Sequence, residues 1–145
     1  MDKASKAADK LWSKDRLEYL DEQNALLDEE IALLEKKKKE AEDYIAEDKA
    51  DLERAAANAG FSVAYDENGN ITNYRSIMDS LAEELIAAEK RMNSFATQEQ
   101  QDAYEETVLE PLRKKIEELE AAIALYEESL ETAEDVDKEI QDALD

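Results

Sequence analysis

The residues in this sequence that could do chemistry are carboxylates, and they gather in three places. Residues 28–30 and 117–120 are runs rich in Asp and Glu, and residues 66–70 (DENGN) carry the carboxylates and glycine of a calcium-binding loop. A calcium loop would need an acidic ligand where Tyr74 and Arg75 stand. Paired carboxylates act as acid and base only in a pocket that raises one pKa. We therefore expect no catalytic residue, metal site or cofactor.

The composition excludes further classes of function. There is no cysteine and no histidine, so thiolate nucleophiles and zinc–thiolate sites are impossible and the commonest general base is missing. Forty acidic residues against 18 basic ones give a formal charge of −22, which repels nucleic acid backbones and anionic lipid. No apolar run is long enough to span a membrane, and the first residues lack the apolar core of a signal peptide. We expect neither an enzyme nor a membrane or nucleic-acid binder.

The elements that must position these residues are long helices. Two glycines and one proline are too few for the turns of a sheet protein, and 40% charged residues is typical of coiled coils. From residue 20, one set of positions alternates spacings of four and three, and nine of its twelve members are apolar, which indicates a coiled-coil seam. The seam residues are Leu20, Asn24, Leu27, Ile31, Leu34, Lys38, Ala41, Ile45, Asp48, Leu52, Ala55 and Ala59.

The helical pattern breaks once, near the middle of the chain. Gly60 suits a left-handed residue that ends a helix, and Asn68-Gly69 lies between alternating β-prone residues. Asn-Gly in that setting is the strongest short-range signal for a β-hairpin. We predict a single coiled-coil domain over residues 1–145, with helix 1–59, hairpin tip 60–73, helix 74–95, an interrupted segment 96–111 and helix 112–145. Asn73 is expected to cap the second helix, and Thr97 with Gln100 forms a capping box in the interrupted segment.

The fold class that we expect is all-α: a long antiparallel helical-hairpin coiled coil with a short β-hairpin at its tip. Pairing around that tip would bring Leu17 opposite Ile116 and Leu52 opposite Leu81. The alternative is a three-helix bundle in which residues 98–145 fold back along the first two helices. The seams would also favour self-association into a homo-oligomer.

Side chains suited to recognition or register are few. Three polar residues on the seam, Asn24, Lys38 and Asp48, are the kind that set register or partner number. Aromatic and apolar side chains at the ends of the arm could pack on the helices or anchor a partner. These interaction candidates are Trp12, Phe61, Val63, Tyr65 and Tyr74.

Residues 17–34, the tip residues 60–63 and 66–74 (DENGNITNY) and residues 126–131 (YEESLE) together resemble a known segment. They are similar to a coiled-coil segment of siphophage tail tape measure proteins, of the kind found in phages of gut Firmicutes. The resemblance implies a structural role in the virion tail, as a ruler of tail length and an assembly scaffold. It also implies other phage tail proteins as partners, and the host bacterial cytoplasm as the place of assembly.

A second function remains open. An acidic rod could imitate a nucleic acid backbone and so inhibit a host nuclease or defence enzyme. Residues 98–145 contain seventeen acidic and four basic residues, a net charge of −13. A row of carboxylates on one face would favour such a mimic, whereas mixed Lys/Glu pairs at a spacing of four would favour a solvated coiled coil.

Overall fold

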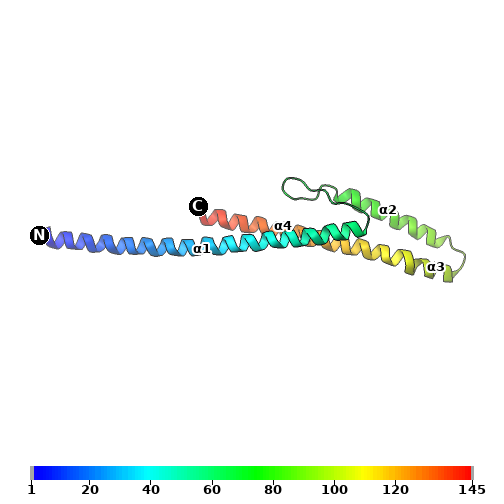
Figure 1. The fold of residues 1–145 in the computed structure, drawn as a ribbon, viewed down its shortest axis with the longest axis horizontal. Coiled ribbons are helices and arrows are strands. Elements are labelled where there is room, and N and C mark those ends of the chain that lie inside the picture. Colours follow the sequence, from blue (N-terminus) through cyan, green and yellow to red (C-terminus); the bar gives the residue numbers. More distant parts are fainter. Residues whose placement is uncertain (1, 145) are drawn as a thin grey trace. The chain divides into compact units, whose positions relative to one another are not determined.

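The computed structural model describes the backbone of residues 2–144 and the side chains of residues 13–144. The chain is all-α (Figure 1), with helices α1 (Asp2–Asn58), α2 (Tyr74–Asn93), α3 (Gln98–Tyr104) and α4 (Glu110–Leu144), and a π-helix, η1 (Glu105–Leu109). Within residues 2–144 there is no strand, only an isolated antiparallel bridge between Tyr65 and Ile71. The predicted β-hairpin is therefore wrong.

The hairpin fails because two side chains take the place of strand partners. The tight turn expected at Asn68-Gly69 needs positive φ at both residues, but Gly69 (φ +84°) has it and no described non-glycine residue does. The Asn73 amide also bonds the backbone, accepting from the Ala64 N–H at 2.9 Å and donating to the Ser62 carbonyl at 2.8 Å. Asn73 precedes α2 but makes no side-chain cap bond there, because its amide is engaged in the loop.

Asp66 organises the rest of the loop. Its carboxylate accepts from the backbone N–H groups of Asn68 and Asn70, both at 2.9 Å. A side chain that bonds its own backbone two residues on forms an Asx-turn, which competes with a strand ladder. These bonds lower the pKa of Asp66, the Asn70 N–H being the largest cause.

The described chain divides into two compact units, and the first comprises residues 42–132. In this unit α4 runs beside the end of α1 and beside α2 (Figure 1). The Ser129 hydroxyl of α4 donates to the Asp48 carboxylate of α1, and Arg113 of α4 lies 3.6 Å from Glu89 of α2. The expected pairing instead places Asp48 opposite α2. The long arm paired around the tip is therefore wrong.

The core of this unit is drawn from α1, α2, η1 and α4. Its largest fully buried side chains are apolar except for the hydroxyl of Tyr126. They are Leu52, Leu81, Leu109, Leu119 and Tyr126. Leu52 and Ala56 lie one turn apart on the same stripe of α1. The predicted seam continues from Leu52 to Ala55, but Ala55 is only partly buried and its neighbour Ala56 is buried instead.

The segment between α2 and α4 contains the capped N-terminus of α3 and the π-helical turn η1. The Thr97 hydroxyl accepts from the Gln100 N–H at 3.2 Å, which confirms the predicted N-cap of α3. In η1 the Glu110 N–H bonds the Glu105 carbonyl, five residues back. Pro111 follows directly after Glu110. In a regular α-helix the proline ring would clash with the carbonyl four residues earlier, and proline has no N–H to bond that carbonyl. The wide turn accommodates this proline within a nearly continuous helix.

The second unit comprises residues 1–41 and 133–145, from the first part of α1 and the last part of α4. Lys37 lies 3.4 Å from Glu139 and Lys38 lies 3.6 Å from Asp137, so these helix segments run antiparallel. Leu34 and Ala41 of α1 and Val136 of α4 are buried. Both ion pairs are exposed and contribute little to stability, so the buried apolar residues hold this pair together.

Candidate helix-association surface

The candidate site is the part of α1 that α4 does not cover. Every described side chain from residue 13 to residue 30 is exposed, whereas Ile31 is half-buried and Leu34 is buried. Helix formation here follows from the composition, because α1 has no glycine or proline and is rich in Ala, Leu, Glu and Lys. The seam nevertheless continues through this exposed half. Leu17, Leu20 and Leu27 retain 61%, 45% and 41% of their accessible surface.

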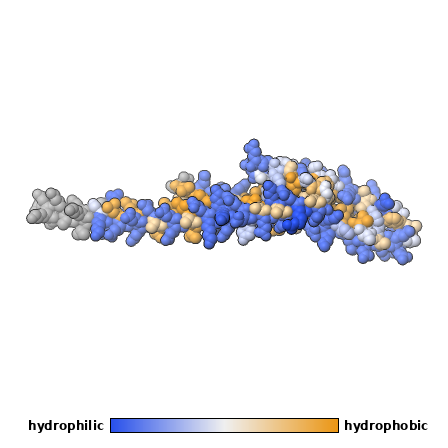
Figure 2. Space-filling view, in the orientation of Figure 1, coloured by the Kyte–Doolittle hydropathy of each residue, from blue (hydrophilic) through white to orange (hydrophobic). Residues whose placement is uncertain are grey.

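We call the seam positions Leu17, Leu20, Asn24 and Leu27 the open seam. Their spacings of three, four and three place them on one face of the helix. Figure 2 shows apolar side chains at the surface of this part of α1, beside the side chains drawn in grey. The open seam is continuous with Ile31 and Leu34, which begin the stretch that is covered in the same unit. It therefore has the pattern of a helix-packing surface without a helix on it.

A second apolar column was not recognised in the sequence. Tyr19, Leu26 and Leu33 recur every seven residues and are 58–65% exposed. Each precedes a seam residue by one position, which places the column about 100° around the helix from Leu20 and Leu27. Trp12 continues this seven-residue spacing in the sequence, but its side chain lies outside the described residues. The sequence contains this seven-residue repeat, but each of its members is next to a residue of the more regular seam, which was identified instead.

The three register candidates have different surroundings. Asn24 lies exposed in the middle of the open seam. Lys38 pairs with Asp137, and half-buried Asp48 accepts the hydroxyl bond from Ser129. Lys38 and Asp48 therefore each bond to α4, whereas the Asn24 side chain stays exposed.

The interaction candidates near the loop pack inward more than they face solvent. Phe61, Val63 and Tyr65 are partly buried against the core, and only Tyr74 is largely exposed. The Tyr65 ring meets the Tyr126 ring edge-on, with 5.7 Å between centroids. These side chains fasten the loop to the helices and present no continuous surface.

Polar contacts around Tyr65 complete this fastening. Its hydroxyl donates to Glu53 at 3.3 Å, and the Lys49 ammonium lies 4.6 Å from its ring centroid. Burial and the Glu53 carboxylate raise the pKa of Tyr65. Burial, with Asp66 and Glu53 nearby, also raises the pKa of Tyr126. Both phenols therefore stay neutral at physiological pH and can donate their hydroxyl hydrogens.

Tyr126 of α4 contacts the loop between α1 and α2. It is buried, and its hydroxyl donates to the Gly69 carbonyl. A Cβ added to Gly69 would lie 3.2 Å from that hydroxyl oxygen, so the two groups approach closely. No local pattern links residues 57 positions apart, which is why this contact escaped prediction.

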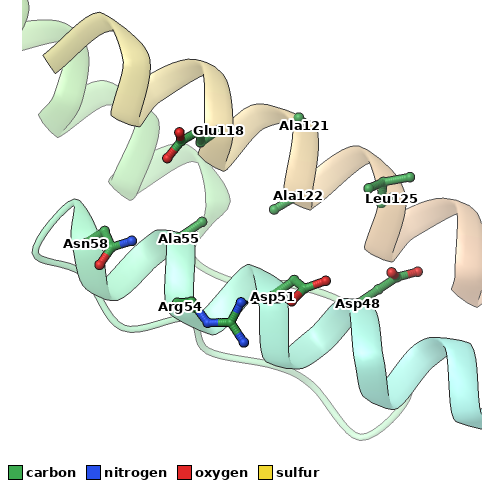
Figure 3. Close-up of a pocket in the computed structure, with 9 residues that line it drawn as sticks. All are labelled: Asp48, Asp51, Arg54, Ala55, Asn58, Glu118, Ala121, Ala122 and Leu125. Atoms are coloured by element: carbon green, nitrogen blue, oxygen red, sulfur yellow. Dashed lines mark hydrogen bonds and ion pairs between the residues drawn. The ribbon is translucent and has the colours of Figure 1, made fainter. Parts of the chain in front are cut away.

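A shallow hollow lies between α1 and α4, within residues 42–132 (Figure 3). Small residues such as Ala55 and Ala121 leave the space, and Arg54 at its side pairs with Asp51 at 3.2 Å. That pair lies along α1, Glu118 pairs with Lys114 along α4, and half-buried Asp48 accepts the hydroxyl bond from Ser129. The hollow lacks the buried, convergent polar groups of a catalytic or ligand-binding pocket.

The described residues form neither a metal-ligand cluster nor a membrane-spanning helix. No group of three or more Asp or Glu side chains there could hold a metal ion. The described helices also include none with the length and apolarity to cross a membrane. Compared with known proteins, the chain matches no family model, no curated sequence and no solved structure.

Proposed function

We propose that this chain has a structural role and acts by associating with other helices through the open seam, and not by catalysis. The observation that carries the proposal is the seam itself. An apolar stripe with coiled-coil spacing continues along α1 past the point where α4 covers it. Leucines at such spacing stabilise a helix most when a second helix packs against them and buries them.

The charges of this segment support a need for a partner. Residues 17–31 contain six carboxylates and no basic residue. Glu18 lies three and four positions before Asp21 and Glu22, so like charges face each other along the helix and destabilise it. Helices in water derive most of their stability from packing an apolar face. A partner on the open seam would supply that packing.

The resemblance to tail tape measure proteins places such a role in a phage tail, as part of a ruler and assembly scaffold. A ruler needs a length that scales with residue number. The 57 residues of α1 correspond to about 85 Å at the rise of an α-helix. This tail assignment rests on the resemblance, and the open seam supports the more general role in helix association.

The alternative, an acidic inhibitor that imitates nucleic acid, is favoured by the net charge of −13 over residues 98–145. The pattern of ion pairs supports the structural role instead. Arg113 lies within 3.6 Å of Glu89 and 3.2 Å of Glu105, and Lys114 pairs with Glu118 one turn on. Basic residues thus interrupt the acidic surface, whereas a mimic needs an unbroken row of carboxylates. Binding to a panel of host nucleases would distinguish the two functions.

Sedimentation of the full chain over a range of concentrations tests the proposal. We expect the wild type to self-associate and the triple variant Leu17→Gln, Leu20→Gln, Leu27→Gln to be monomeric. The matched control is Tyr44→Gln, Ile86→Gln, Leu125→Gln, which removes three comparably exposed apolar side chains elsewhere and should associate like the wild type. A monomeric wild type, or equal behaviour of the two triple variants, would contradict the proposal.

A further inference from the structure

The loop between α1 and α2 contains the one Asn-Gly pair of the sequence, Asn68-Gly69. The backbone nitrogen that follows an asparagine can attack the carbon of the side-chain amide, and this reaction makes asparagine a thermolabile residue. Glycine permits the attack best, because it has no Cβ to crowd the approach. Asn68 is exposed, so water can reach it. The pair therefore has the residue types and the exposure of a deamidation site.

The reaction at this pair needs no co-reactant except water. The Gly69 nitrogen loses its proton and bonds to Cγ of Asn68, and the side-chain nitrogen takes up a proton and leaves as ammonia. This forms a succinimide ring. One water molecule then opens the ring at either carbonyl carbon and gives aspartate or isoaspartate at position 68. In isoaspartate the main chain passes through Cβ and Cγ, so it is longer by one carbon.

The folded loop holds the reacting atoms in a conformation that does not close this ring. The Gly69 N–H donates to the Asp66 carbonyl at 3.1 Å, and no described residue except glycine has positive φ. Such a bond, with negative φ at the two central residues, is that of a type I turn, in which the second central residue has ψ of about 0°. Asn68 is that residue, and this ψ turns the Gly69 nitrogen away from its side chain. Ring closure therefore requires Asn68 to rotate out of the turn.

Tyr126 of α4 fixes Gly69 in this position. Its hydroxyl donates to the Gly69 carbonyl, and a Cβ on Gly69 would lie 3.2 Å from that hydroxyl and 3.6 Å from Leu130. A rotation at Asn68 moves Gly69 and its carbonyl, so it must break this bond. We propose that Asn68 is a site of spontaneous deamidation and that the bond from Tyr126 to Gly69 controls its rate. The site is protected while the bond is made and reacts when the loop opens.

The modification also prevents the loop from closing again. The added main-chain carbon of isoaspartate lies between the Asn68 Cα and Gly69, so the Gly69 carbonyl no longer meets the Tyr126 hydroxyl. The new carboxylate follows those of Asp66 and Glu67 and adds to their repulsion. Deamidation at Asn68 thus releases the loop from α4.

Peptide mapping by mass spectrometry tests the proposal in the full chain, incubated in mildly alkaline buffer with and without urea. In urea, Asn68 should deamidate faster than any other asparagine. In the folded chain it should react about 20-fold more slowly than in urea, because opening breaks two hydrogen bonds worth about fivefold each. Equal rates in the two conditions, or faster reaction of another asparagine in urea, would overturn the proposal.

The variant Tyr126→Phe isolates the contact that controls the rate. It removes the hydroxyl and keeps the ring, so Asn68 in the folded chain should deamidate about fivefold faster than in the wild type. In urea the two rates should agree. The matched control is Ser129→Ala, which removes a different hydroxyl bond of α4, to Asp48 of α1, and should leave the rate unchanged. Equal acceleration in both variants, or none in Tyr126→Phe, would overturn the control by Tyr126.

Discussion

The contact between Tyr126 and Gly69 allows a quantitative test of how the loop is held. Tyr126 is buried on α4, its ring packs edge-on against Tyr65, and its hydroxyl donates to the Gly69 carbonyl. Gly69 has φ +84°, and an added Cβ would lie 3.2 Å from the hydroxyl oxygen and 3.6 Å from Leu130. The perturbations are Gly69→Ala and Tyr126→Phe, made singly and together in the full chain.

The expected free energies follow from these distances. Tyr126→Phe removes one hydrogen bond, which contributes about 1 kcal/mol net. Gly69→Ala forces a side chain into the left-handed region at about 1–2 kcal/mol. It also pushes the hydroxyl from its place and so weakens the same hydrogen bond. The single Gly69→Ala change should therefore lower the free energy of unfolding by about 2–3 kcal/mol.

The double variant separates these contributions. With Phe at position 126 the close contact and the hydrogen bond are both absent, so Gly69→Ala should cost only the backbone conformation. We expect a coupling free energy of about 1 kcal/mol between the two sites. Urea denaturation of the four chains, followed by circular dichroism, measures it. Additive effects within about 0.3 kcal/mol would refute the reasoning, because residues that share a contact must couple.

Three other changes have expected outcomes in thermal or urea denaturation. Leu52→Ala, at a fully buried position, should destabilise residues 42–132 by about 2–5 kcal/mol. Leu33→Ala, at an exposed position, should change the free energy of unfolding by less than about 0.5 kcal/mol. Equal effects of the two variants would contradict the assigned core. Pro111→Ala should stabilise the chain by about 1–3 kcal/mol, because an N–H is restored inside a helix, and a loss of stability would show that the wide turn of η1 depends on other contacts. Asp66→Asn should destabilise the loop near neutral pH. The folded pKa of Asp66 lies below its usual 3.8, so the carboxylate stabilises the fold above pH 3.8 and loses this effect as the pH falls through the folded pKa; a difference from the wild type that does not shrink in acid would contradict the turn.

The sequence predicts the helical class well and the pairing of helices poorly. The seam through Leu34 and Leu52 and the left-handed Gly60 are local patterns of one helix, and the structure has both. Which helix covers a seam depends on contacts between distant residues, such as Asp48 with Ser129. Many acidic helices share the same periodicity, so the pattern of α1 alone cannot distinguish α2 from α4 as its partner.

The loop shows why a strong local signal can fail. Asn68-Gly69 predicts a tight hairpin from backbone preferences alone, but the Asp66 carboxylate and the Asn73 amide bond the backbone groups that strands would use. Such side-chain competition is invisible to alternation rules. The open seam shows a different limit of sequence patterns. Periodicity predicts an apolar stripe, but it does not predict which part of that stripe another helix of the same chain covers.

Amide hydrogen exchange over residues 13–30 tests the central claim most directly. An exposed helix with like charges on successive turns frays and exchanges fast, whereas a helix packed on a partner is protected. We predict slow exchange in the concentrated wild type, and fast exchange both on dilution and in the variant Leu17→Gln, Leu20→Gln, Leu27→Gln. Fast exchange of these amides in the wild type at every concentration, with residues 42–58 still protected, would contradict association through the open seam.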